Sequence, residues 1–484
     1  VCLGGLLVIL INTISYPFYR DDVLSRFAPN ARLLFETANI PGNLTGYPFL
    51  VQLWYAFAFM ASGGVNDHAA GWIVAAFAGG MVLVTFAIGR AILTKSTAWT
   101  SIILLLSCPL FVDWSTSGYV DVPVGVYHGL TFLLAFLWVD RGHFRAAILT
   151  GAMAGLALLT KQSALVLIFV LPVVPLLRGW PRRNFRAETI RGLAALATTL
   201  LIAGPWYLRN LVLAGSQGVL PAPGAYDAQF IDDSIQSLLT FIGDAGEWGL
   251  WFSAPALIGV ALWIGVMFGM GPSKQKLMLS RRSALLLAAF ILPYHVIWWQ
   301  GFSYQTRYLL ASAPLYAILA GHGAEWIIKR IPMVSQISRW PIIMLASTLV
   351  FLGSYKRIGA VYHLFLHPLQ NDDAKLTRLS PDSWALVKHI RATIEPGSWL
   401  YVMDGTLAYW LHEYELRQGY PTYLADLDGY DYFVTAPASR SVYSFYGTTE
   451  NEVVQSLGDQ SFLPEVYRHS DAIAIFQVNT STAR

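Results

Sequence analysis

The chain has 484 residues, of which 55% are hydrophobic and only 13% are charged. Soluble domains carry about 25% charged residues, so this composition excludes a soluble globular protein and indicates a polytopic membrane protein. The formal net charge is +3 and there are only two cysteines, so we expect no disulfide framework and no nucleic-acid partner.

Apolar segments recur along the chain at lengths close to the 17–25 residues that cross a bilayer. The chain opens without Met on VCLGGLLVILINTISYPF, so we expect residues upstream to be missing and interpret this opening as the rest of a first span. Eleven spans are predicted, at residues 1–18, 69–90, 97–112, 121–139, 144–160, 163–178, 189–208, 249–270, 283–299, 305–325 and 341–357. The apolar stretch Tyr47–Ser62 is predicted as a helix lying on the membrane, because its loop must return to the same side.

Basic residues indicate the orientation of these spans. One set of alternate connections contains sixteen, namely Arg90, Lys95, Arg141, Arg145, Arg178, Arg182, Arg183, Arg186, Arg191, Lys274, Lys276, Arg281, Arg282, Lys329, Arg330 and Arg339. The opposite connections contain six, namely Arg20, Arg26, Arg32, Lys161, Arg209 and Arg307. By the positive-inside rule the first set is cytoplasmic. The long loops 19–68 and 209–248 and the C-terminal region are therefore expected to face outward.

The composition changes near residue 371. Residues 371–484 contain eight Lys and Arg against fifteen Asp and Glu. Strand-like runs at 399–403, 431–435 and 472–478 alternate with predicted helices at 383–393 and 406–418, a pattern typical of a small α/β domain. The sequence thus predicts a transmembrane domain at 1–370 and an outward extramembrane domain at 371–484.

Polar residues concentrate on the outward side of the predicted topology. Asp21 and Asp22 follow the first span, and Asp113 and Asp121 flank the next outer loop. Lone cations, Lys161, Arg209 and Arg307, occupy other outer turns. Further candidates for lining a substrate site are Tyr47, Asp113, His295 and Tyr304. The sequence shows no zinc-ligand spacing, Gly-rich phosphate loop or nucleophile elbow, and we expect no dedicated metal site, although a divalent cation stays possible.

Carboxylates beside cations at a lipid boundary suit sugar transfer from a polyprenyl phosphate. The lipid tail of such a donor lies in the bilayer, and its phosphate and sugar lie at the interface. A carboxylate removes the proton from an acceptor hydroxyl, while Lys, Arg or a divalent cation stabilises the phosphate leaving group. The structural alternatives are a solvated helix end for the Asp pair, a snorkelling Lys161 and a helix-end anchor at Arg209.

Several motifs occur in the order seen in one family: YRDD, TANIPGNLTGYPFLVQLWYAF, GYVDVPVGVY, GLALLTKQSALV, PWYLRNLVLAGSQGVLPAP and YQTRYLLASAPLYAILAGHG. With these motifs the chain resembles the GT-C superfamily of integral-membrane glycosyltransferases, in its branch similar to protein mannosyltransferases and lipid A aminoarabinose transferases. The resemblance covers nearly the whole chain. One departure is YPFL, where members often have a second Pro, and it affects the expected shape of the interfacial loop.

The resemblance implies a GT-C-like fold and a glycosyltransferase that uses a polyprenyl-phosphate-linked sugar. It implies that Asp22 or Asp21 is the catalytic carboxylate, with Asp22 preferred as general base, and that Asp121 is the second acidic position. Lys161, Arg209 and Arg307 match basic positions expected to meet the lipid phosphate. The implied acceptor is a glycan, a lipid or a protein, and the implied location is a bacterial or archaeal cytoplasmic membrane with the active site facing outward.

Two other classes of function remain open from the residues. A transporter of a lipid-linked or small solute should carry charged or broken helices near the bilayer midplane, whereas the spans here are nearly charge-free inside. A non-catalytic structural subunit that retains the fold is the second alternative. For that subunit, loss of Asp22 would leave both activity and assembly unchanged.

Overall fold

The computed structural model describes residues 1–40, 47–182, 185–219, 229–237, 245–269, 280–330, 339–419, 424–435, 463–470 and 473–478. Parts of the predicted outer loops, at 41–46, 220–228 and 238–244, lie outside the described residues. The chain divides into two compact units, one formed by Val1–Ser15 with Thr37–His367 and the other by Tyr16–Glu36 with Pro368–Arg484. Each unit is described by itself.

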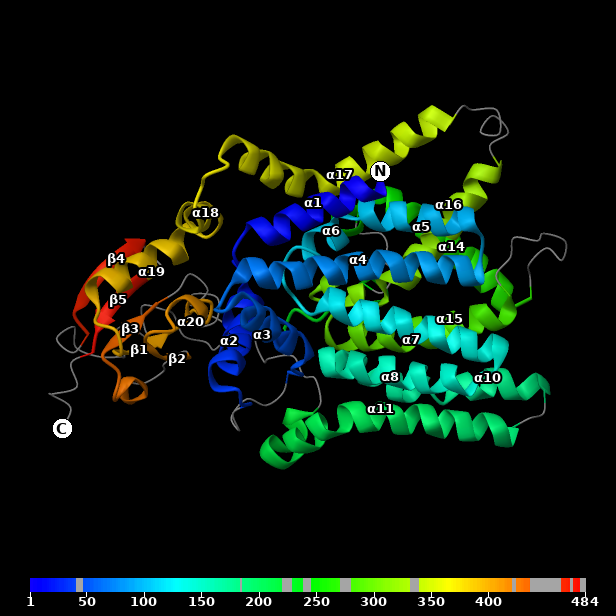
Figure 1. The fold of residues 1–484 in the computed structure, drawn as a ribbon, viewed down its shortest axis with the longest axis horizontal. Coiled ribbons are helices and arrows are strands. Elements are labelled where there is room, and N and C mark those ends of the chain that lie inside the picture. The colour runs from blue at the N-terminus through cyan, green and yellow to red at the C-terminus, as the bar shows by residue number, and fades with distance from the viewer. Residues whose placement is uncertain are drawn as a thin grey trace. The chain divides into compact units, whose positions relative to one another are not determined.

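The first unit is a bundle of helices that lie side by side (Figure 1). Its α-helices are α1 (Cys2–Ser15), α3 (Leu50–Ser62), α4 (Asp67–Ile92), α5 (Lys95–Ser107), α6 (Pro109–Trp114), α7 (Asp121–Arg141), α8 (Phe144–Thr160), α9 (Val166–Val170), α10 (Val173–Arg182), α11 (Phe185–Ala214), α14 (Leu250–Met267), α15 (Arg281–Gly301), α16 (Ala313–Arg330) and α17 (Arg339–Leu366). Helical structure lies over each of the eleven predicted spans.

Six helical segments of the described residues are long and apolar enough to cross a membrane: Asp67–Ile92, Asp121–Arg141, Gln162–Gly179, Phe185–Ala214, Gly246–Met267 and Arg281–Gly301. Shorter apolar helices are Cys2–Ser15, Leu50–Ser62 and Phe144–Thr160. The chain is therefore an integral membrane protein, and the count of eleven spans stays a prediction. The predicted interfacial helix within Tyr47–Ser62 corresponds to α3.

Glycines allow helices of the first unit to approach closely. A Cβ on Gly151 of α8 would lie 2.1 Å from the Ala195 carbonyl oxygen of α11. In the α14–α16 pair the arrangement is reciprocal, because a Cβ on Gly259 would lie 1.9 Å from Leu319 O and one on Gly323 would lie 2.0 Å from Pro255 O. Small residues at such crossings are typical of helix packing in membranes, where dispersion contacts between backbones replace the hydrophobic effect.

The second unit contains a five-stranded sheet in the order β2-β1-β3-β5-β4. The strands are β1 (Trp399–Val402), β2 (Glu415–Gln418), β3 (Tyr432–Val434), β4 (Glu465–Ser470) and β5 (Ile473–Gln477). β1 pairs in parallel with β2 and β3, and β5 pairs antiparallel with β3 and β4. The helices are α18 (Asp372–Leu379), α19 (Pro381–Thr393) and α20 (Leu407–Trp410). Its core includes Tyr401, Met403, Leu427, Phe433 and Phe476.

The secondary structure of this unit differs from the prediction in two places. The predicted helix at 406–418 is wrong, because only α20 is helical and the chain then forms β2, in which Leu416 pairs with Leu400 of β1. Sheet pairing here outweighs the helical propensity of the segment. Strand β4 was not predicted, because its residues, EVYRHS, are mostly polar. The predicted strands at 399–403, 431–435 and 472–478 coincide with β1, β3 and β5.

The first predicted outer loop is divided between the units. Its beginning, Tyr16–Glu36, clusters with the C-terminal residues, whereas Thr37 onward clusters with the helical bundle. This beginning contains the π-helical turn η1 (Val23–Phe27) and most of α2 (Ala28–Thr37). Aromatic residues of this beginning explain why it belongs to the second unit, because they are buried against α18 and α20.

Candidate active site

The acidic pair Asp21 and Asp22 stands at the start of a helical segment in the second unit. The backbone of Asp22 is already helical, with φ −64° and ψ −26°, and the π-helical turn η1 follows it. Asp21 is exposed and Asp22 is half-buried. Single π-helical turns occur frequently at functional sites, and carboxylates are stabilised near the N-terminus of a helix. The turn therefore gives the two neighbouring carboxylates different environments.

Apolar contacts fix this turn onto the C-terminal part of the second unit. Val23, Leu24 and Phe27 are each at most 1% exposed. The Phe18 and Tyr409 rings meet edge to face at 6.4 Å between centroids. The Arg378 guanidinium also donates a hydrogen bond to the Tyr16 hydroxyl at 2.9 Å. The fold of the C-terminal residues thus positions the acidic pair.

A buried ion pair joins Asp121 and Lys161 in the first unit. Asp121 is the first residue of α7, and Lys161 lies where α8 ends, in extended conformation with φ −153° and ψ 139°. The Lys161 Nζ lies 2.5 Å from Asp121 Oδ1, and the residues are 6% and 2% exposed. Lys161 is therefore paired in the protein interior, and the snorkelling interpretation is wrong. Such a pair is costly to desolvate, so it points to a functional or an architectural role.

The Tyr308 ring lies beside this ion pair and also contacts Arg307. The Lys161 Nζ lies 3.9 Å from the centre of the Tyr308 ring. The Arg307 guanidinium carbon lies 5.2 Å from the same ring, 4.8 Å from the Trp114 ring and 4.6 Å from the Tyr119 ring. Residues 121, 161 and 307, far apart in the sequence, thus meet around one tyrosine. The described contacts thus place two cations, Lys161 and Arg307, against the same aromatic ring.

Arg209 has its described contacts on its own helix. Its guanidinium donates to the Asn210 side-chain oxygen at 3.0 Å and lies 5.2 Å from the centre of the Trp206 ring. The Trp206 ring in turn packs at a tilt against Phe49, which precedes α3, with 4.9 Å between the ring centroids. These contacts link α11 to the interfacial segment. They do not include Lys161 or Arg307.

The remaining predicted substrate-lining residues occupy different places. His295 on α15 is 6% exposed, and its Nδ1 lies 2.9 Å from the Tyr316 hydroxyl. Tyr304 meets Tyr308 edge to face at 6.2 Å, so it borders the Lys161–Arg307 group. Tyr47 is half-buried just before α3. Tyr304 is thus the member of this set whose described contacts reach the ion pair's surroundings.

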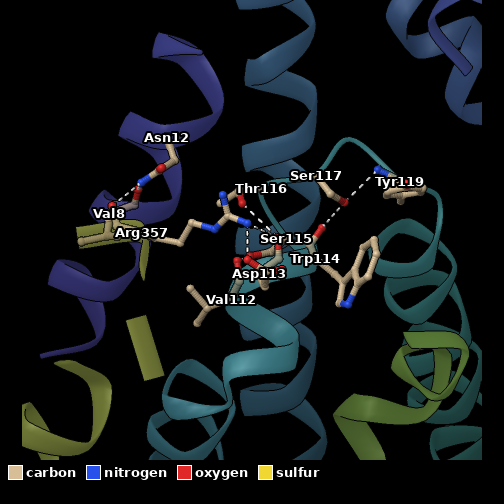
Figure 2. Close-up of polar contacts among 10 residues, drawn as sticks. All are labelled: Val8, Asn12, Val112, Asp113, Trp114, Ser115, Thr116, Ser117, Tyr119 and Arg357. Atoms are coloured by element: carbon tan, nitrogen blue, oxygen red, sulfur yellow. Dashed lines mark hydrogen bonds and ion pairs between the residues drawn. The ribbon is translucent and has the colours of Figure 1, made fainter. Parts of the chain in front are cut away.

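Asp113 forms an ion pair that the sequence did not indicate. Figure 2 shows the Arg357 guanidinium of α17 directed at the Asp113 carboxylate of α6, and the two groups form a hydrogen-bonded ion pair. In the sequence, Arg357 is the last residue of the predicted span 341–357, a place that does not indicate a carboxylate partner. The signal that would have found it is the run Tyr355-Lys356-Arg357, a basic pair at the predicted outward end of a span.

Among the residues that the structure describes, no three His, Cys, Asp or Glu side chains are grouped to hold a metal ion. The described residues therefore offer no ligand set for the divalent cation that the sequence left open. Around Tyr308 the described groups are the Asp121 carboxylate, the Lys161 and Arg307 cations and several aromatic rings.

Comparisons with known proteins agree with this architecture. Residues 47–208 match the family model described as dolichyl-phosphate-mannose-protein mannosyltransferase. The structure is similar to ArnT from Cupriavidus metallidurans bound to undecaprenyl phosphate, with a TM-score of 0.64 at 15% identity, over 98% of this chain and 96% of that one. It is also similar to the Archaeoglobus fulgidus oligosaccharyltransferase in its apo form, with a TM-score of 0.62 at 10% identity, over 99% of this chain and 74% of that one. No curated protein sequence matches the chain.

The chain therefore has the fold of the GT-C superfamily of membrane glycosyltransferases. The segment that matches the mannosyltransferase family model contains Asp121 and Lys161, the two members of the buried ion pair.

Proposed function

We propose that this protein is a glycosyltransferase that moves a sugar from a polyprenyl-phosphate donor to an acceptor hydroxyl at the outer membrane–water interface. The observation that carries the proposal is the group formed by Lys161, Arg307 and Asp121 around Tyr308. It supplies positive charge at the outward ends of membrane helices. The similar structure of ArnT was determined with undecaprenyl phosphate bound, and an archaeal oligosaccharyltransferase of the same fold with a dolichol phosphate.

In the proposed reaction, the acceptor hydroxyl oxygen attacks the anomeric carbon of the donor sugar. A new carbon–oxygen bond forms as the bond to the phosphate oxygen breaks, and the electron pair of the broken bond stays on the polyprenyl phosphate. Lys161 and Arg307 stabilise the charge that develops on this phosphate. Asp121 holds the Lys161 ammonium in place rather than acting as a base, because its carboxylate is already engaged by Lys161. Attack opposite the leaving group inverts the anomeric centre.

Asp22 is the proposed general base and accepts the proton of the acceptor hydroxyl. Asp22 is half-buried whereas Asp21 is exposed, a difference that supports the choice of Asp22. The outward orientation rests on the sixteen basic residues of the opposite connections.

The test is transfer by the purified full chain in lipid nanodiscs. A panel of polyprenyl-phosphate-linked sugars serves as donor, cell-envelope extract serves as acceptor, and release of polyprenyl phosphate is measured. Asp22→Asn should lower the rate by about 10²–10⁴-fold, the usual contribution of a general base, while Asp21→Asn should retain most activity. Loss with Asp21→Asn instead would move the base by one residue. Full activity in both variants would contradict the proposed mechanism.

A further inference from the structure

A cavity lies between α6, the start of α14 and α17 in the first unit. Its volume is about 250 Å³, and its charged and aromatic lining consists of Asp113, Trp114, Glu247, Trp251, Tyr355, Lys356 and Arg357. Sites for drug-sized ligands measure about 300–1,000 Å³, so this cavity suits one ring-sized group. None of the roles in the proposed reaction uses it.

We propose that this cavity binds a neutral, hydroxyl-rich ring of the acceptor, that is, a sugar or cyclic polyol group. The inference rests on the proposed function, because it assigns the acceptor class of that reaction. Three observations support it: the lining residues, the balance of their charges and the link to the Lys161–Arg307 group.

The charges around the cavity balance. Asp113 and Glu247 provide two carboxylates, and Lys356 and Arg357 provide two cations. An anionic ligand would face both carboxylates, and a cationic one would face both cations. Hydroxyl groups donate hydrogen bonds to carboxylates and accept them from ammonium and guanidinium groups, so a neutral polyol satisfies both kinds of lining residue without burying an uncompensated charge.

Two tryptophans provide apolar surface beside these charges. The Trp251 indole is fixed by a hydrogen bond from its Nε1 to the Ser107 carbonyl oxygen at 2.7 Å. Trp114 packs edge to face with Tyr119 at 4.9 Å. The C–H face of a pyranose ring is apolar and packs on such indole surfaces, while its hydroxyls reach polar groups at the rim. Indole rings beside charged side chains are therefore a lining that suits a sugar ring.

Trp114 connects the cavity with the proposed phosphate-binding group. The same indole lines the cavity and lies 4.8 Å from the Arg307 guanidinium carbon. A ring bound in the cavity would thus be separated from Arg307 by one side chain. This proximity is what an acceptor subsite beside a donor phosphate requires.

The wall formed by α17 is held firmly. The backbone oxygen of Arg357 accepts a hydrogen bond from the Asn12 side chain at 3.0 Å, and the Arg357 guanidinium pairs with Asp113 (Figure 2). A Cβ on Gly353 would lie 2.0 Å from Ser107 O, so α17 is pressed against the end of α5. Preorganised walls lower the ordering cost of binding.

The test uses variants at the exposed rim, because removing Arg357 would break its described ion pair with Asp113 and endanger folding. In the transfer assay, Glu247→Gln and Lys356→Met should raise the acceptor KM about tenfold, the loss of one charged contact worth about 1.4 kcal/mol. The donor KM and the release of polyprenyl phosphate without acceptor should not change. Glu395→Gln and Lys388→Met, in the second unit, are matched controls. An unchanged acceptor KM in both rim variants would overturn the inference.

A binding measurement separates this inference from the proposed function. Saturation-transfer NMR with methyl α-D-mannopyranoside should show contact with the wild-type protein in nanodiscs and a weaker signal for Glu247→Gln. If wild type shows contact but releases no polyprenyl phosphate from any donor, the proposed function fails while the sugar site stands. No contact with the glycoside, or displacement of it by inorganic phosphate, would overturn the sugar site.

Discussion

A buried ion pair lies beside each end of α7, and the two pairs differ in the number of groups that hold them. At the end of α7 near Trp138, the Glu188 carboxylate accepts hydrogen bonds from Trp138 Nε1 at 3.0 Å and Arg178 Nε at 2.9 Å, and it also pairs with Arg191. Arg178 donates further to the Val139 carbonyl oxygen at 2.5 Å. At the other end, roughly 25 Å away at 1.5 Å per residue, Asp121 meets Lys161 beside Tyr308.

This difference separates an architectural ion pair from one that can exchange partners. The donors around Glu188 come from α7, α10 and α11, so they tie three helices together and leave little for a ligand to replace. Lys161 has one described carboxylate partner, and a second cation, Arg307, lies against the same Tyr308 ring. An arriving phosphate would find positive charge there and could share the Lys161 ammonium with Asp121.

The largest expected effect comes from neutralising the Asp121–Lys161 pair. In the double variant Asp121→Asn with Lys161→Met, no uncompensated charge remains buried, so folding should be retained. Transfer should nevertheless fall by about 10²–10³-fold, the cost of removing one electrostatic contact to a developing charge. Transfer rate and thermal unfolding of the purified protein are the measurements. If the double variant transfers sugar at the wild-type rate, the Asp121–Lys161 pair has an architectural role, like the ion pairs of Glu188.

Breaking the other pair should affect stability instead. Glu188→Gln leaves Arg178 and Arg191 without their shared carboxylate, and loss of one partner of a buried pair costs about 3–5 kcal/mol. The apparent melting temperature should drop, while the transfer rate per folded molecule stays close to wild type. Thermal unfolding of Glu188→Gln beside the Asp121/Lys161 double variant tests the contrast. A rate loss without destabilisation would place Glu188 in function and erase the distinction.

Substitutions of Arg307 and Arg209 test which cations near the Asp121 end of α7 bind the donor phosphate. Arg307→Gln should raise the donor KM by roughly tenfold or more, since hydrogen bonds to charged groups are worth about 1.5–3 kcal/mol. Arg209→Gln should have a smaller effect if Arg209 anchors α11 through Asn210 and Trp206. Measuring the donor KM of each variant distinguishes the two roles. Equal increases would return Arg209 to the phosphate site that the sequence predicts for it.

Single cysteine substitutions, which should perturb the protein least, test which end of α7 faces outward. A cysteine in place of the exposed Ser96, at the start of α5 and beside the basic residue Lys95, should resist an impermeant thiol reagent in intact cells. A cysteine in place of the exposed Ala392 of α19 should react. The background is a Cys2→Ser variant, because Cys108 is buried whereas Cys2 is partly exposed. The reverse labelling would overturn the outward placement of the Asp121 end.

The sequence was sufficient to predict most helices and the strands β1, β3 and β5, because apolar run length and alternation report these elements directly. It also pointed to Asp121, Lys161 and Arg307, as lone charges at predicted span ends. It could not show that Lys161 pairs with Asp121, since that contact joins residues 40 apart through the packing of α7 and α8. Nor could it show the Asp113–Arg357 pair, whose members are 244 residues apart.

The prediction for residues 406–418 failed for a related reason. A helix is specified by neighbouring residues, but β2 exists because Glu415–Gln418 pairs with β1, and such pairing depends on residues distant in the sequence. The same limit applies to the segment Tyr16–Glu36, whose place in the second unit depends on contacts with Arg378 and Tyr409. Local patterns therefore predicted elements well and tertiary partners poorly.

The most direct test of this account is binding of undecaprenyl phosphate to the purified full chain, measured by native mass spectrometry. The wild-type protein and Glu188→Gln should both retain the lipid, whereas the double variant Asp121→Asn with Lys161→Met should bind it at least about tenfold more weakly, a difference of about 1.4 kcal/mol. Equal retention by the double variant, or no retention by the wild type, would contradict the assignment of this end of α7 to the lipid phosphate.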